Sequence, residues 1–159
     1  MKKLTLIILA SFTFLHSQAI EFEETKFLSA LDTETFKRGE ILYDENKMVI
    51  HYNKGRIITK VDNNLTIQNS SGKVIATINL IEKPHLSLYF RLIKALFLMD
   101  FKSLEKDFDI DKNGSKYIFK PKGNITKAVK LIELYLDKES VQTIIISFVN
   151  NDKITIKTL

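Results

Sequence analysis

The feature that most constrains the fold is the alternation of apolar and polar residues along short segments separated by turn residues. Such alternation is typical of β-strands, because successive side chains of a strand point to opposite faces of the sheet. The pattern predicts strands at residues 20–30, 35–44, 47–53, 56–62, 64–69, 73–80, 108–113, 115–121, 128–137, 140–149 and 152–158. Turn residues separate them at positions 44–46, 53–55, 62–64, 70–72, 113–114 and 150–152.

One segment, Pro84 to Met99, has helical spacing instead. Its apolar residues fall on one helical face, at Leu88, Tyr89, Leu92, Ile93, Leu96 and Phe97. Its polar residues form a narrow stripe of Ser87, Arg91 and Lys94. Pro84 suits the first turn of a helix, and the segment is shorter than the roughly 20 residues of a membrane span. We therefore expect a helix that packs on the protein's own sheet, where it can also cover an apolar ligand.

These elements predict the fold class. Short connections between consecutive strands indicate antiparallel hairpins, and the βαβ rhythm of a parallel sheet is absent. Eleven strands with one helix in the middle predict a mainly β fold with α, an unclosed antiparallel β-barrel covered by a central helix. No internal repeat or linker interrupts residues 20–159, so we expect one domain.

Residues 1–19 have the composition of a secretory signal peptide. Lys2 and Lys3 precede an apolar run from Leu4 to Leu15, and Ser17-Gln18-Ala19 supplies small residues for cleavage. An uncleaved membrane anchor is the alternative, but the run is shorter than the roughly 20 residues that a span needs. We expect a cleaved leader and a periplasmic protein.

Charge and cysteine content exclude other classes. Removing Lys2 and Lys3 from the formal charge of +5 leaves +3, and the remaining lysines alternate with acidic and apolar residues. Nucleic-acid binding proteins concentrate their basic residues in a stripe, so we expect no nucleic-acid partner. The chain has no cysteine, and this excludes disulfides and thiolate chemistry.

Candidate catalytic residues are few. After the leader, His51 and His85 are the two histidines, far apart and without the spacing of metal ligands. Glycine-rich phosphate loops and a Gly-x-Ser-x-Gly nucleophile motif are also absent. We expect no metal, no cofactor and no enzymatic activity.

One segment, Asp109 to Gly114, matches the opening half of a calcium-binding loop. Lys120 occupies the position where that loop needs a bidentate glutamate, and no helices flank the segment. The pair Asn113-Gly114 instead favours a type I′ turn between two strands.

Two late segments are apolar on both faces. Residues 128–137 carry Ile132, Leu134 and Leu136 on one face and Val129, Leu131 and Tyr135 on the other. Residues 140–149 carry Ile144, Ile146 and Phe148 on one face and Val141, Ile145 and Val149 on the other. A strand that is apolar on both faces is covered on both. The helix would cover one face and a partner or ligand the other, although a thick core accounts for the pattern equally well.

A series of segments carries a family resemblance. Phe22-Glu23-Glu24-Thr25-Lys26-Phe27-Leu28 is followed by Gly39-Glu40-Ile41-Leu42-Tyr43 and Lys47-Met48-Val49-Ile50-His51-Tyr52. After the helix come LEKDFDID from Leu104, Phe119-Lys120-Pro121-Lys122, and the strands LIELYLD, TIIISFV and KITIK. In this order, over residues 22–158, the chain resembles the LolA-like periplasmic lipoprotein carriers. It lacks the family's Trp near Ile50 and has Glu45-Asn46-Lys47 where the family has Arg-Pro.

The resemblance implies an unclosed barrel with a helical lid over a cavity for acyl chains. The cargo would be an acylated lipoprotein or another lipid, received from an inner-membrane ABC exporter and delivered to an outer-membrane acceptor. We expect a monomer.

We assign the lipid-binding cavity to apolar residues of the third strand, the helix and two late strands: Met48, Ile50, Tyr52, Leu88, Leu92, Leu96, Ile132, Leu134, Ile144, Ile146 and Phe148. Each methylene kept from water contributes about 0.8 kcal/mol, so one acyl chain represents on the order of 10 kcal/mol. Release then requires the helix to close over the empty cavity. The alternative function is a periplasmic protein-interaction or sensor module on the same fold.

Overall fold

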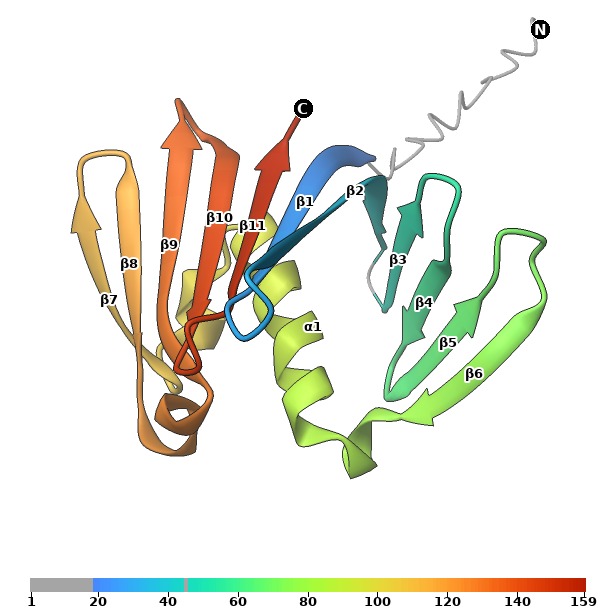
Figure 1. The fold of residues 1–159 in the computed structure, drawn as a ribbon. Coiled ribbons are helices and arrows are strands. Elements are labelled where there is room, and N and C mark those ends of the chain that lie inside the picture. Colours follow the sequence, from blue (N-terminus) through green and yellow to red (C-terminus); the bar gives the residue numbers. More distant parts are fainter. Residues whose placement is uncertain (1–18, 45) are drawn as a thin grey trace, which may run out of the picture.

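The structure, a computed structural model, describes residues 19–44 and 46–159. The predicted signal peptide, residues 1–19, lies outside the described residues except for Ala19. One antiparallel sheet of eleven strands has the order β6-β5-β4-β3-β2-β1-β11-β10-β9-β8-β7. In Figure 1 strands β7 to β11 lie on one side of helix α1 and strands β3 to β6 on the other. Because β6 and β7 are edges, the sheet is unclosed, and this confirms the predicted mainly β fold with one open antiparallel sheet and one helix.

The predicted elements match the observed ones. The first half of the sheet contains β1 (Ile20–Leu28), β2 (Thr33–Tyr43), β3 (Lys47–Tyr52), β4 (Ile57–Val61), β5 (Asn64–Gln68) and β6 (Val74–Asn79). The second half contains β7 (Phe108–Asn113), β8 (Lys116–Pro121), β9 (Val129–Asp137), β10 (Ser140–Phe148) and β11 (Lys153–Thr158). Between the halves lies α1 (Pro84–Phe97), and the short 3₁₀ helices are η1 (Leu80–Glu82), η2 (Phe101–Leu104) and η3 (Gly123–Lys127).

Helix α1 ends two residues earlier than predicted. Met99 has φ = 53°, the left-handed conformation that stops a helix. Its N–H donates to the carbonyl of Leu96 at 3.2 Å, and the N–H of Asp100 donates to that of Ala95 at 2.9 Å. These two bonds form a Schellman motif, which satisfies the last carbonyls of the helix.

One face of the sheet forms the core. Phe119 on β8 lies opposite Ile132 on β9, and Ile132 lies opposite Ile146 on β10. In the next row Leu134 lies opposite Ile144, and further buried positions continue the face through β1, β2 and β3. We call this apolar surface the inner face. It packs against α1, η1 and η2.

Two register shifts between β9 and β10 change the predicted faces. One places Val141 opposite Leu136, and the other places Val129 opposite Phe148. Both valines are 8% exposed, on the inner face. The prediction that they lie on the other face is therefore wrong, because a bulge adds one residue and reverses the alternation beyond it.

The outer face of β9 and β10 is only partly covered by the chain itself. Leu131, Tyr135 and Ile145 on the outer face are half-buried, whereas the inner-face residues beside them are fully buried. Cover of this face by a partner or ligand stays a prediction.

The hairpin between β7 and β8 differs in detail from the prediction. Asn113 pairs with Lys116, so the two loop residues are Gly114 and Ser115. Gly114 has φ = 62° and Ser115 is not among the residues with positive φ. A positive φ at the first loop position alone is the type II′ pattern, whereas the predicted type I′ turn requires it at both.

Candidate functional site

The structure gathers most of the predicted cavity residues into the core. Eight are at most 3% exposed: Met48, Ile50, Leu92, Leu96, Ile132, Leu134, Ile144 and Ile146. Tyr52 and Phe148 are half-buried against this cluster, and among the described residues Leu88 lies outside it. The predicted cavity is therefore the closed contact between α1 and the inner face.

Helix α1 contributes one side to this contact. Its buried residues are Phe90, Leu92, Ile93, Ala95, Leu96 and Phe97, and the strand closest to it is β10. Lys83 joins the start of α1 to η1, and residues 98–100 join its end to η2. An ion pair from Arg91 to Asp107, at the protein surface, also fastens the helix to the chain that follows η2.

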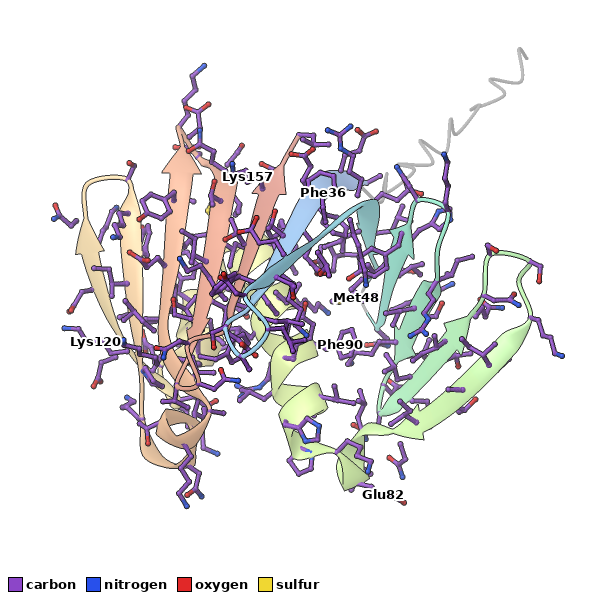
Figure 2. The ribbon with its side chains drawn as sticks, in the orientation of Figure 1. Phe36, Met48, Glu82, Phe90, Lys120 and Lys157 are labelled. Atoms are coloured by element: carbon purple, nitrogen blue, oxygen red, sulfur yellow. The ribbon has the colours of Figure 1, made fainter. Side chains whose placement is uncertain are left out.

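A solvent-open hollow lies between α1 and the strands β3 and β4. It has a volume of about 350 Å³, and Met48, Phe90, Ala95 and Leu98 form its apolar lining. In Figure 2 Met48 on β3 and Phe90 on α1 lie on either side of the space between these elements. Four basic side chains also line it: Lys47, Lys60, Arg91 and Lys94. We call this hollow the helix groove.

Two further hollows lie near the ends of the strands. One, of about 520 Å³, contacts Phe97, Met99, Val141 and Leu159 near the C-terminus of α1. The other has a volume of about 390 Å³ and is lined in part by Phe148. Like Met48 in the helix groove, Phe148 is a predicted cavity residue that lines an open hollow.

A polar cluster interrupts the inner face where β1 and β3 meet the helix. The hydroxyl of Tyr52 donates to Oε2 of Glu24 at 3.1 Å. Burial raises the pKa of Tyr89, and the charge of Glu24 raises it further. The buried hydroxyl of Tyr43 has no hydrogen-bond partner among the described residues. Sequence reasoning placed Tyr52 in the cavity and Tyr89 on the apolar face of the helix but missed Glu24 and Tyr43. Glu24 shares its strand face with the buried Phe22, and this parity is a usable signal.

Burial also raises the pKa of Tyr43 and of Tyr52, and the neighbouring Glu24 adds to the shift at Tyr52. These phenols therefore stay protonated, because desolvation disfavours the phenolate. An unpartnered buried hydroxyl costs about 1–3 kcal/mol, so the cluster weakens the closed contact locally.

The remaining candidate residues are the two histidines and the carboxylates of the calcium-like segment. Nδ1 of His51 lies 3.3 Å from Oε1 of Glu40, and His85 is exposed on α1. The carboxylates of the calcium-like segment pair with lysines, Asp111 with Lys120 at 2.7 Å and Asp109 with Lys122 at 3.2 Å. In the part of the chain that the structure describes, no three metal-ligating side chains come together. Helices long and apolar enough to cross a membrane are likewise absent from the described residues.

Comparisons with known proteins find similarity in structure. No protein-family model matches the sequence, and no curated protein matches it. The structure aligns with the crystal structure of a LolA superfamily protein from Nitrosomonas europaea, with 8% sequence identity and a TM-score of 0.41. The alignment covers 89% of this chain and 83% of that chain. A similarity of this degree does not place the chain in a family.

Proposed function

We propose that the protein is a periplasmic carrier that binds acyl chains between α1 and the inner face. The observation that carries this proposal is the packing of α1 on the inner face. The amphipathic helix α1 buries its apolar residues on a continuous apolar face of an open sheet. In the proposed movement the helix lifts from the inner face by a change of backbone conformation at Lys83 and at residues 98–100, while the eleven strands stay paired.

The free energy lost when α1 leaves the inner face is comparable to the free energy gained when one acyl chain leaves water. Five large apolar side chains of α1 are buried on closure: Phe90, Leu92, Ile93, Leu96 and Phe97. At about 1.5–3 kcal/mol for each, undocking the helix costs on the order of 10 kcal/mol. One acyl chain recovers on the order of 10 kcal/mol when its methylenes leave water. Such a balance allows both loading and release.

The residues of the proposed cavity are those on both sides of the closed contact. Ile132, Leu134, Ile144 and Ile146 would contact the chain from the sheet, with Met48 and Ile50 on β3. Leu92 and Leu96 would contact it from the helix. We propose an acylated lipoprotein or another lipid as cargo, moved by a monomer from an inner-membrane ABC exporter to an outer-membrane acceptor, without covalent chemistry or a cofactor.

Native mass spectrometry of the protein purified from a bacterial periplasm tests this proposal. We expect a co-purifying lipid, and uptake of lipid again after delipidation. A protein that is free of lipid and takes up none would contradict the proposal and favour the interaction or sensor module.

A matched pair of variants locates the cavity. Leu92→Glu places a carboxylate at a position that is 3% exposed, whereas Leu31→Glu makes the same change at a position that is 68% exposed. We expect Leu92→Glu to abolish lipid uptake and Leu31→Glu to retain it, with the sheet signal in circular dichroism preserved in both. Leu92→Ala serves as a second variant without the buried charge. Full uptake by both Leu92 variants would show that the cavity lies elsewhere.

A further inference from the structure

The helix groove combines an apolar lining with an excess of positive charge. Its basic residues are Lys47, Lys60, Arg91 and Lys94, and its acidic residue among the described ones is Asp100. The basic residues come from both walls, β3 and β4 on one side and α1 on the other. The groove opens beside Phe90 and Ala95, which are buried in the closed contact.

Local partners cancel only part of this charge. Arg91 pairs with Asp107, a residue outside the groove lining. Nζ of Lys60 donates to the carbonyl oxygen of Asp62 at 2.8 Å, and a carbonyl leaves the charge of the ammonium uncompensated. Lys47 is exposed at the start of β3. The ammonium groups of Lys47 and Lys60 therefore give the β-strand wall of the groove a positive potential.

We propose that the helix groove binds the carboxylate of a fatty acid whose acyl chain enters beneath α1. This inference rests on the proposed function and specifies its cargo as an anionic, single-chain lipid. The volume of about 350 Å³ lies near the lower end of the 300–1,000 Å³ typical of small-molecule sites. It suits a small headgroup and the first methylenes of one chain.

The kind of donor left in the groove favours a carboxylate over a phosphate. Arg91, the side chain suited to bidentate phosphate binding, is already engaged by Asp107. Lys47 and Lys60 remain as point charges, without the planar fork that binds two phosphate oxygens at once. The hydroxyl of Ser87 on the helix wall adds a neutral donor.

Titration of the delipidated full chain with dodecanoate and with the uncharged 1-dodecanol tests the proposal. The test variant is Lys47→Gln/Lys60→Gln. The control variant is Lys130→Gln/Lys157→Gln, which removes the same charge from exposed positions on β9 and β11. We expect the test variant to bind dodecanoate about tenfold more weakly, or about 1.4 kcal/mol, and to bind 1-dodecanol unchanged. The control should bind both as the parent does.

Other results separate the two proposals. Equal binding of dodecanoate by parent and test variant would overturn the carboxylate site and leave the acyl carrier standing. Binding of neither probe by the parent would overturn the carrier, and with it this inference. Lauroyl lysophosphatidate bound more than tenfold more tightly than dodecanoate would overturn the choice of a carboxylate headgroup.

Discussion

Weakening the helix contact should strengthen lipid binding. Ile93 on α1 is 1% exposed and belongs to the closed contact, but it is not among the residues that we assign to the cavity. Replacing a buried isoleucine by valine costs about 0.5–1.5 kcal/mol. Ile93→Val removes this energy from the closed state, whereas in the open state the side chain has left the inner face.

The expected magnitude follows from the population of the open state. When binding requires a rare state, the apparent dissociation constant equals the intrinsic one divided by the fraction in that state. A loss of about 1 kcal/mol raises the open fraction about fivefold. Titration of delipidated Ile93→Val with dodecanoate should therefore show about fivefold tighter binding, while the melting temperature falls by about 4 °C.

Ile110→Val is the control for this experiment. Ile110 lies on β7, three strands away from β10, the strand closest to the helix. The same change there should lower stability slightly and leave lipid affinity unaltered. If Ile93→Val lowers the melting temperature while its affinity stays constant or weakens, the helix is a fixed part of the core and the reasoning fails.

Three further changes test the local physics of the fold. A Cβ on Gly39 would lie 2.4 Å from the carbonyl oxygen of His51, so Gly39→Ala should lower the free energy of unfolding by about 1–3 kcal/mol in urea titration; an unchanged midpoint would refute this close approach. The backbone N–H of Ser29 holds the pKa of Asp152 below its ordinary value of 3.8. The stability that Asp152 contributes should be complete above pH 3.8 and lost as the pH falls below it. If the parent keeps a higher free energy of unfolding than Asp152→Asn in acid, the assignment is contradicted. Because Met99 has φ = 53°, Met99→Gly should raise the free energy of unfolding by about 0.5–1 kcal/mol in the same titration, and a decrease would refute the strain.

The strands and the helix could be predicted because each depends on local signals. Alternation, turn residues and the Pro84 helix start act within a few residues, and all eleven predicted strands agree with the structure to within two residues. The faces of Val129 and Val141 could not be predicted in this way. The bulges that turn them inward depend on the pairing between β9 and β10.

The candidate site was predictable in part for a related reason. Periodicity identifies Leu92, Leu96, Ile132 and Ile144 as apolar positions, and the structure buries all four. It does not say whether the helix rests on the sheet or stands away from it. The helix groove was missed because Lys47 and Lys60 are brought to α1 only by the curvature of the sheet.

The distance between α1 and the sheet, with and without lipid, tests the central claim most directly. The chain has no cysteine, so spin labels can be attached selectively at His85→Cys on α1 and Lys130→Cys on β9, both exposed. We predict that pulsed electron paramagnetic resonance shows a longer mean distance and a broader distance distribution between the labels when the delipidated protein is saturated with dodecanoate. An unchanged distance in a sample that binds dodecanoate fully would contradict the movable helix.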